Sequence, residues 1–326
     1  MNILNQSSGT GWNLYHGDCV EVLKGLPDNS VGMTIFSPPF AGLYVYSNSD
    51  RDLGNSKTDD DFCRHFHFVV EQLFRVTKPG RIVAFHCMNI PAMKERDGYI
   101  GLKPFRDDLT RMFLAAGFYL HSEHVIWKDP LIEATRTKAL GLMHKQLCKD
   151  SSMVRAGIPD YLIAVRKPGT NSNPIPHEGG LTEFIGQDAP TIKGESDVME
   201  RLYSYLMGRS SCPERIKVRS HEYWRRYASP VWMDIDQSRT LNRDGAREEK
   251  DERHICPLQL DVIDRALVLW SNPGDVVLSP FAGIGSEGYQ AVKHGRKFIG
   301  AELKESYYKQ AVLNLRAAEQ TQEVLI

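Results

Sequence analysis

The segment Ser37-Pro38-Pro39-Phe40 combines a hydroxyl, a rigid backbone and an aromatic ring directly after an apolar run, Val31–Phe36. An apolar run of this length predicts a buried strand, and two consecutive prolines cannot continue it or enter a helix interior. We therefore expect the hydroxyl and the ring to be held rigidly at the tip of a strand. An oxygen acceptor and a ring face fixed in this way can position a planar substrate group for reaction.

A second segment, Asp275–Gly285, predicts a strand, then a turn with Gly283 and Gly285, then the start of a helix. Glycine lets the backbone adopt positive φ and come close to a ligand. This geometry is typical of a nucleotide-like ligand at the carboxyl end of a parallel strand. Glu302 follows 17 residues after Gly285, near the spacing of roughly 20 typical of an acid that binds ribose hydroxyls. The alternative is an ordinary acid at a strand end.

Together these two segments resemble the motifs of the DNA amino-methyltransferases, which methylate an exocyclic amino group of adenine or cytosine with S-adenosylmethionine. The catalytic motif of that family is Asp/Asn/Ser-Pro-Pro-aromatic, and its cofactor motif is Phe-x-Gly-x-Gly, here Phe281–Gly285. The catalytic motif comes first in this chain, which resembles the permuted order of the family's β group.

The resemblance assigns a cofactor site for S-adenosylmethionine, with S-adenosylhomocysteine as product and no metal. The residues that it implies are Asp18, His254, Ser279, Phe281, Gly283, Gly285 and Glu302. Asp18 would lie near the adenine of the cofactor, or else it simply forms a turn with Gly17. Ser279 stands where the family often has an aspartate, and Asp275 or another acid is a candidate to replace that carboxylate.

The resemblance also assigns the catalytic site to Ser37, Pro38, Pro39 and Phe40. The Ser37 side chain and the Pro38 carbonyl would accept hydrogen bonds from the target amino group and aim its lone pair at the methyl group. Phe40 would stack on a base flipped out of the duplex, because the target atom cannot be reached inside it. A serine in the first position favours cytosine N4, with adenine N6 as the alternative.

Strands and helices alternate along the rest of the chain. The fold expected is therefore α/β, a doubly wound, mostly parallel, Rossmann-like sheet of the S-adenosylmethionine-dependent methyltransferase type, with an inserted DNA-recognition region. Strands are predicted at 12–18, 31–36, 81–87, 118–128, 160–166, 276–279 and 297–301, and helices at 19–26, 59–77, 104–116, 258–270, 287–294 and 306–318.

A change in composition after residue 167 predicts an insert. The chain is expected to divide into a catalytic half (1–167), a DNA target-recognition insert (168–253) and a cofactor-binding half (254–326). Basic and aromatic residues are mixed within the insert, and residues 201–230 hold seven basic and two acidic side chains. A confined basic stretch on a protein of net charge −1 fits contacts with DNA phosphates, although a solvated charged face is the alternative. The candidate DNA-binding residues are Arg209, Arg215, Arg219, Arg225 and Arg226.

Composition excludes several classes of protein. No apolar run approaches the roughly 20 residues of a membrane helix, and the amino-terminal residues do not resemble a signal peptide. The six cysteines are scattered without a Cys-x-x-Cys pair, which favours reduced thiols and disfavours structural zinc. We expect a cytoplasmic, nucleoid-associated protein encoded by a bacterium or a phage.

Partners and alternatives follow mainly from the resemblance. The expected partner is double-stranded DNA. A homodimer is also expected, and its interface could use an apolar face of the 59–77 helix or of its neighbours. Any restriction endonuclease would be a separate chain or absent. The alternatives are methylation of RNA or protein by the same fold, and a non-enzymatic DNA-binding module with a decayed site.

Overall fold

The computed structural model describes residues 3–39, 59–92, 94–137, 139–188, 214–242 and 257–323. Nine strands form one sheet in the order β1-β2-β11-β10-β3-β4-β8-β7-β9. The five strands from β2 to β4 in this order are parallel to one another, and β8 is antiparallel to both of its neighbours. The mostly parallel α/β fold predicted from the sequence is confirmed. The strands are β1 (Ile3–Gly9), β2 (Trp12–Gly17), β3 (Val31–Phe36), β4 (Thr77–Cys87), β7 (Tyr119–Ile126), β8 (Asp160–Arg166), β9 (Val231–Trp232), β10 (Val276–Ser279) and β11 (Lys297–Glu302).

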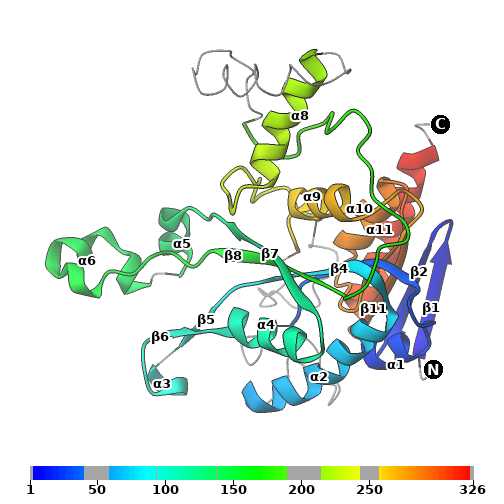
Figure 1. Cartoon of the computed structure of the whole chain (residues 1–326). Helices are drawn as coiled ribbons and strands as arrows, with labels where there is room; N and C mark the ends of the chain where they lie inside the picture. The colour runs from blue at the N-terminus through cyan, green and yellow to red at the C-terminus, as the bar shows by residue number, and fades with distance from the viewer. Residues whose placement is uncertain are drawn as a thin grey trace.

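Helices cover both faces of the sheet (Figure 1). One face carries α1 (Cys19–Lys24), α2 (Asp59–Val76) and α4 (Phe105–Ala115), and the other carries α9 (Leu260–Trp270), α10 (Ser286–Lys293) and α11 (Glu305–Glu323). Each of these helices lies close to its predicted range. The doubly wound arrangement therefore follows from the alternation of elements along the chain.

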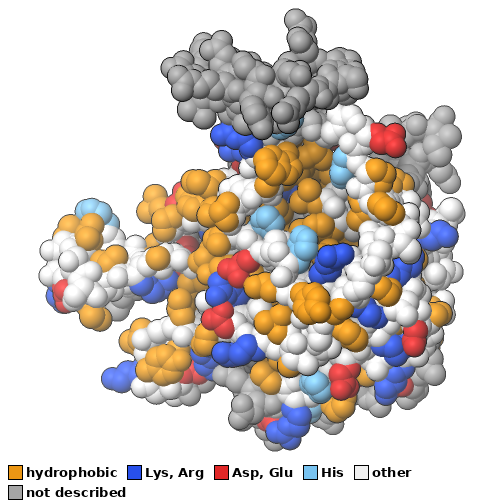
Figure 2. Space-filling model, in the orientation of Figure 1, with side chains coloured by type: hydrophobic (Ala, Val, Ile, Leu, Met, Phe, Trp, Pro, Cys, Tyr) orange, Lys and Arg blue, Asp and Glu red, His pale blue; other side chains and the backbone are white. Residues whose placement is uncertain are grey.

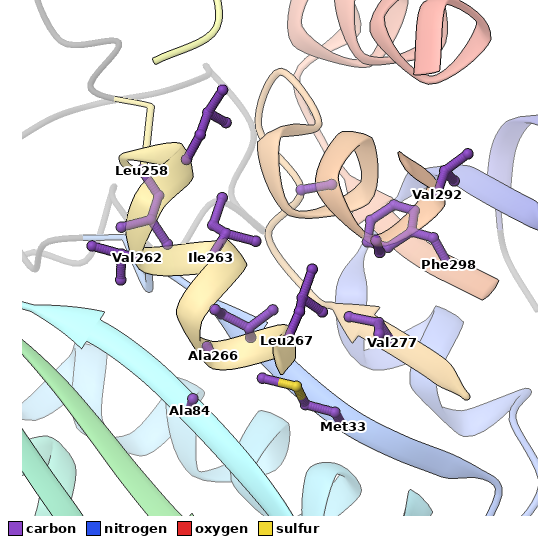
Figure 3. Packing of buried hydrophobic residues seen from close by; sticks show 14 of the residues in the cluster. Met33, Ala84, Leu258, Val262, Ile263, Ala266, Leu267, Val277, Val292 and Phe298 are labelled. Carbon is purple, nitrogen blue, oxygen red and sulfur yellow. The ribbon is translucent and has the colours of Figure 1, made fainter. Parts of the chain in front are cut away.

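Alternating side chains of the central strands divide the interior into two cores. Ile82 and Ala84 of β4 belong to the core under α9, whereas Val83 and Phe85 belong to the core under α2. Successive strand residues point to opposite faces, so a central strand that is covered on both sides is apolar throughout. Figure 3 shows α9 lying over the sheet, with Ala266 and Leu267 near Ala84, Met33 and Val277.

Some elements differ from the predictions. The predicted helix at 59–77 and strand at 81–87 leave a break of three residues, Lys78-Pro79-Gly80, between them, but β4 already begins at Thr77. Gly80 has a φ of 72°, and the register with β3 shifts between Val31 and Met33, so an irregular pairing accommodates the proline. The edge strand β1 and the small sheet of β5 (Ile90–Ala92) and β6 (Gly101–Lys103) were not predicted.

The proposed dimer face on the 59–77 helix is a further correction. Phe62, Phe66, Val69, Val70 and Leu73 of α2 are buried in the core. That apolar face therefore holds the helix to its own sheet and is not free for a second chain.

An arm extends from the sheet between β7 and β8 and holds α5 (Pro130–Thr137), η2 (Leu140–Leu142), α6 (His144–Lys149) and η3 (Ser151–Met153). Figure 1 shows it projecting away from the sheet. Hydrophobic side chains gather on the part of its surface that is visible in Figure 2. Leu131 and Ile132 of α5 are 73% and 68% exposed, unlike the apolar residues of α2.

The helix α8 (Glu214–Tyr227) stands on the side of α9 that faces away from the sheet (Figure 1). Its Tyr223 and Tyr227 form a small core with Leu181 and Ile185. The Tyr227 hydroxyl accepts a hydrogen bond from the backbone amide of Ile185 at 2.8 Å. The helix α8 therefore packs against residues of the segment that follows β8.

Candidate active site

Five parallel strands bring the predicted site residues to one edge of the sheet. Because the carboxyl ends of parallel strands meet at the same edge, the segments that follow β2, β11, β10 and β3 lie side by side. Asp18, Glu302, Ser279 and Ser37 occupy or immediately follow those ends. β10 pairs directly with β3, with Leu278 opposite Thr34. The next strand after β10, β11, lies on one side of this pair, and the next strand after β3, β4, lies on the other side. Ligands of doubly wound sheets bind at such a change of direction.

Ser37 lies within a chain of polar contacts. Its Oγ is 3.1 Å from Nδ1 of His86, and the other ring nitrogen, Nε2, is 3.2 Å from a carboxylate oxygen of Asp160. Lys128 donates a hydrogen bond of 2.5 Å to the second oxygen of Asp160. Three of these side chains are largely buried, with exposed fractions of 10% for His86, 4% for Asp160 and 22% for Lys128.

The sheet register explains why these four residues meet. Phe36 is opposite Phe85, so Ser37, just after β3, lies level with His86 near the end of β4. β8 runs antiparallel to β4 and begins at Asp160, which places its first residue at this edge. β7 ends at Ile126, opposite Asp160, and Lys128 follows two residues later.

Asp160 is a buried carboxylate with two partners. Burial alone would raise its pKa, but the nearby His86 and the charge and hydrogen bond of Lys128 more than offset this, and the pKa is lowered from its ordinary value. An opposite charge and hydrogen bonds favour the ionised form of an acid. Asp160 is therefore held as a carboxylate next to His86.

The predicted glycine turn has the required backbone. Gly283 and Gly285 have φ values of 53° and 86°. Residues other than glycine rarely adopt this backbone conformation. Gly285 is the N-cap of α10, and a Cβ atom there would lie 3.1 Å from the Cβ of Ala311. The turn thus leads directly into the start of α10, where the helix dipole is positive.

Glu302 faces this turn from the end of β11. It accepts hydrogen bonds from the backbone amides of Gly283 and Lys304, both at 2.8 Å. A carboxylate has about four lone-pair directions and can accept from hydroxyl groups as well as from amides. The same carboxylate therefore holds the turn and can serve a ligand.

Asp18 caps α1. Its Oδ1 accepts hydrogen bonds from the amides of Val20 and Glu21, at 2.9 and 3.2 Å. The turn-forming role considered in the sequence analysis is therefore present. The side chain stands two residues beyond His16, which is opposite Glu302 in the sheet.

Ser279 and Asp275 lie at opposite ends of β10. The Ser279 side chain is fully buried, and its Oγ has no hydrogen-bond partner among the residues that the structure describes. Asp275 instead forms a buried ion pair with Arg81 at the amino end of the strand. The idea that Asp275 replaces the family's carboxylate near the cofactor is therefore wrong, because the strand separates it from the site.

Phe281 contributes to the core as well as to the turn. Its ring lies 5.7 Å from that of Phe36 and stacks at 6.2 Å on that of Phe66, measured between ring centres. The glycine turn after β10 and the proline segment after β3 are therefore tied together by aromatic packing.

Glu287 is a buried acid that was not singled out from the sequence. It lies in the first turn of α10 and is 4% exposed. Burial, together with the charge of Glu302, raises the pKa of its carboxyl group from 4.5 to about 8. The glycine turn is thus flanked by Glu302 and by a second acid, Glu287, that favours its neutral form.

The candidate DNA-binding arginines are only partly described. Arg219, Arg225 and Arg226 lie on α8, and the last two are 50% and 39% exposed. Arg225 pairs with Glu222 at 3.1 Å, and Arg226 donates to the carbonyl of Asp188 at 3.0 Å. Arg215 belongs to α8, but its side chain lies outside the described residues, as do all of Arg209, His254 and Phe40.

His86, Asp160 and Lys128 are site residues that were not predicted from the sequence. His86 falls within a run predicted as a buried strand, and its partner follows 74 residues later. The sequence offered one signal, which was a polar residue near the end of a predicted buried strand. The order of the strands in the sheet is what shows that His86 adjoins Ser37.

The described ranges hold neither a metal cluster nor a membrane span. They contain no group of three or more histidine, cysteine or acidic residues arranged to hold a metal ion. None of the helices in those same ranges combines the length and apolar character of a membrane span.

The similarity of this chain to known proteins agrees with the geometry. The family model described as DNA methylase matches residues 31–313, which include the Ser37 segment, the glycine turn and Glu302. The chain belongs to this DNA methylase family.

The individual relatives of this chain are distant. It is 22% identical over 297 residues to the type II methyltransferase M.BglII of Bacillus subtilis, covering 90% of this chain and 66% of the relative. It is 24% identical to M.BamHI of Bacillus amyloliquefaciens, covering 89% of this chain and 54% of that protein. The chain therefore spans less than two thirds of the length of these relatives.

Solved structures share the fold. TTHA0409 from Thermus thermophilus, solved with S-adenosyl-L-methionine, matches with a TM-score of 0.59 and 20% identity, covering 94% of this chain and 95% of that one. The cytosine-N4-specific PvuII DNA methyltransferase matches with a TM-score of 0.55 and 17% identity, covering 99% and 95%. At these identities the likeness concerns the fold alone.

Proposed function

We propose that this chain transfers a methyl group from S-adenosylmethionine to an exocyclic amino group of a base in double-stranded DNA. One observation carries the proposal: Ser37 and the Gly283–Gly285 turn follow neighbouring parallel strands, β3 and β10. A base at Ser37 and a methyl donor at the turn would be adjacent. Membership of the DNA methylase family supports this assignment.

The residues at the edge of the sheet fit the methyl donor. Glu302 would accept from ribose hydroxyls, and the turn would bring its backbone amides close to the ligand. The buried Ser279 Oγ, which has no partner among the described residues, would gain one from the bound molecule. Asp18, His254 and Phe281 complete the proposed binding set. S-adenosylmethionine supplies, when bound, a methyl group activated by a sulfonium centre and leaves as S-adenosylhomocysteine.

Ser37 and Pro38 would position the target amino group. The lone pair of an amino group conjugated with a base is a poor nucleophile. Two acceptors, the Ser37 Oγ and the Pro38 carbonyl, would bind its two N–H groups and favour a more tetrahedral nitrogen. Pro39 keeps the segment rigid, so most of the rate enhancement would come from positioning. Phe40 would stack on the base after it has been flipped out of the duplex.

Cytosine N4 is the target that we favour, and adenine N6 is the alternative. Serine at position 37 is the pattern that resembles cytosine-N4 enzymes, and one structural neighbour is named as cytosine-N4-specific. Both amino groups need the same acceptor geometry, so the assignment depends on this resemblance.

The insert, residues 168–253, is proposed as the DNA-recognition region between the two parts of the methyltransferase domain, 1–167 and 254–326. Arg219, Arg225 and Arg226 line one helix, α8, with the first two exposed and the third partly exposed. Positive charges on an outer helix can bind phosphates and fix the register of the duplex. Arg209 and Arg215 are further candidates within the same stretch.

We also propose that the protein forms a homodimer and acts with a separate restriction endonuclease or with none. The apolar surface of the arm, with Leu131 and Ile132 exposed, replaces α2 as the candidate interface. Light scattering at micromolar concentration should give the mass of two chains, and a single-chain mass would refute the dimer.

Methylation of random-sequence duplex DNA with labelled S-adenosylmethionine, followed by mass spectrometry of the nucleosides, tests the function. N4-methylcytosine is the expected product, and N6-methyladenine would establish the alternative target. Ser37→Ala should bind the methyl donor as wild type does but lose most of its turnover.

Two other functions give different results. Transfer of label to RNA or protein but not to DNA would show another substrate of the same fold. Failure to bind S-adenosylmethionine in calorimetry would indicate a non-enzymatic DNA-binding module.

A further inference from the structure

We propose that His86 and Asp160 form a relay that directs the Ser37 hydroxyl and takes up the proton released by the target amino group. The proposal rests on the methyltransferase function proposed above. His86 and Asp160 are positioning residues in this scheme, because they act on the substrate through Ser37.

Asp160 sets the direction of the hydrogen bonds in this relay. Asp160 accepts a hydrogen bond from Lys128 and is held as a carboxylate, so the His86 Nε2 facing it at 3.2 Å should carry the proton. A neutral imidazole has one protonated and one bare nitrogen. Nδ1, 3.1 Å from Ser37 Oγ, is then the bare one and accepts the Ser37 hydrogen.

This direction matters because Ser37 is a hydroxyl and not a carboxylate. A hydroxyl has one hydrogen and two lone pairs, and it presents only acceptors to the substrate when its hydrogen points elsewhere. With His86 Nδ1 accepting that hydrogen, both lone pairs of Ser37 are available to the target amino group. An aspartate at position 37 would need no such partner.

The contact between His86 and Asp160 is close but imperfectly aligned. His86 Nε2 makes no well-aligned hydrogen bond with the described residues, although it lies at ion-pair distance from Asp160 Oδ2. Hydrogen bonds of catalytic groups are often poorly aligned before the substrate binds and then tighten. A small rotation of the ring would bring the two atoms into line.

The relay also provides an acceptor for the proton that the target amino group loses. In the transfer, the new N–C bond forms with the nitrogen lone pair, the C–S bond breaks with its electrons returning to sulfur, and the nitrogen must lose one proton. That proton would move to Ser37 Oγ as the Ser37 hydrogen moves to His86 Nδ1. The resulting imidazolium would be stabilised by Asp160 until it releases a proton to solvent.

The first test reads the tautomer of His86 in the whole protein without DNA. Long-range nitrogen–proton NMR distinguishes a protonated ring nitrogen from a bare one, and the His86 signals are identified by their loss in His86→Asn. We expect protonated Nε2 in wild type and a shift toward protonated Nδ1 in Asp160→Asn, whose amide can donate to Nε2. Protonated Nδ1 in wild type, or no change in Asp160→Asn, would overturn the relay.

The second test is a single-turnover methylation rate at saturating methyl donor and DNA. Asp160→Asn should lower the rate by about 10²- to 10⁴-fold, as expected when a histidine is held in the wrong tautomer, while donor affinity stays within about twofold. The matched control is Asp264→Asn, because Asp264 is equally buried and pairs with another histidine, His294, at 2.9 Å. It should leave the rate unchanged.

Other outcomes are also decisive. An Asp160→Asn rate equal to that of the control would refute the relay. Should Asp160→Asn fail to fold, His86→Asn must show a fall of at least about 10²-fold, and a wild-type rate would refute the proposal. A wild-type protein that methylates no DNA would refute the proposed function, whereas the tautomer measurement would still decide the relay geometry.

Discussion

Arg265 of α9 lies 2.9 Å from the carboxylate of Asp234 and is fully buried beneath α8. The rings of Tyr227, Trp232 and Phe184 surround its guanidinium, with centres 4.8, 5.0 and 5.4 Å away. The guanidinium also donates to the carbonyl of Ile185 at 2.8 Å. These contacts attach the residues around α8 to α9, which packs on the nine-stranded sheet.

Arg265→Met should therefore destabilise the protein. The substitution breaks the buried pair and leaves Asp234 with the more distant Arg226, 3.9 Å away. Breaking a buried ion pair typically costs about 3–5 kcal/mol. Urea unfolding measures this change. Arg64→Met is the control, because the Arg64–Asp61 pair on α2 is 69% exposed at the arginine, and such pairs contribute at most about 1 kcal/mol. Equal stabilities for the two variants would contradict the anchoring role of Arg265.

Glu302→Gln should weaken binding of S-adenosylmethionine by about 10- to 100-fold, because hydrogen bonds to a charged acceptor contribute about 1.5–3 kcal/mol. Isothermal calorimetry gives the affinity. Glu305→Gln is a suitable control, since Glu305 is exposed and pairs with Lys309 at 2.7 Å. A Glu302→Gln affinity equal to that of the control would remove Glu302 from the binding site.

Glu287 should make the folded protein less stable as the pH rises. The pKa of its carboxyl is raised from 4.5 to about 8 by burial and by the charge of Glu302, so the folded protein keeps a proton that the unfolded chain loses. The free energy of unfolding should then fall between pH 4.5 and 8. At about 1.4 kcal/mol for each pH unit, the upper limit of the loss is about 5 kcal/mol.

Urea unfolding across this pH range compares wild type with Glu287→Gln. The variant should lack the decline and should be more stable than wild type near pH 8. Glu178→Gln, which changes an exposed acid, should follow the wild-type profile. Parallel profiles for wild type and Glu287→Gln would show that Glu287 is ionised throughout.

Replacement of Arg225 and Arg226 by alanine should weaken DNA binding and reduce its dependence on salt. Each phosphate contact contributes about 0.9 to the slope of log affinity against log salt concentration, so the double variant should lose up to about 2 from that slope. Arg64 and Arg111, exposed on α2 and α4, provide a control pair. If the salt-dependence slope of the double variant equals that of wild type, the duplex does not contact Arg225 and Arg226.

The sequence predicted the core of the fold because its central strands are apolar and its helices amphipathic. Val31–Phe36, Val276–Ser279 and Lys297–Glu302 are strands as expected, and motif spacing correctly placed the glycine turn after β10. The edge strand β1 was missed because Asn5-Gln6-Ser7-Ser8 is polar. Such a strand is set by its pairing with β2 and not by its own pattern.

The candidate site was predictable only where its residues lie within one motif. Ser37 and Gly283 stand in local patterns, whereas the contact between His86 and Asp160 depends on the order of β3, β4 and β8 in the sheet. Asp275 was misjudged for a related reason. The first residue of a strand lies at the opposite edge from the last, and Arg81 already pairs with it there.

The interleaved strand order also bears on how the chain acquires its structure during synthesis. β10 and β11 lie between β2 and β3, yet the ribosome makes them last. A nascent chain that has not reached Val276 has two strand edges with no partner between them, and unpaired edges promote misassociation. We therefore expect ribosome-bound intermediates to need protection by chaperones until the final strands emerge and close the sheet.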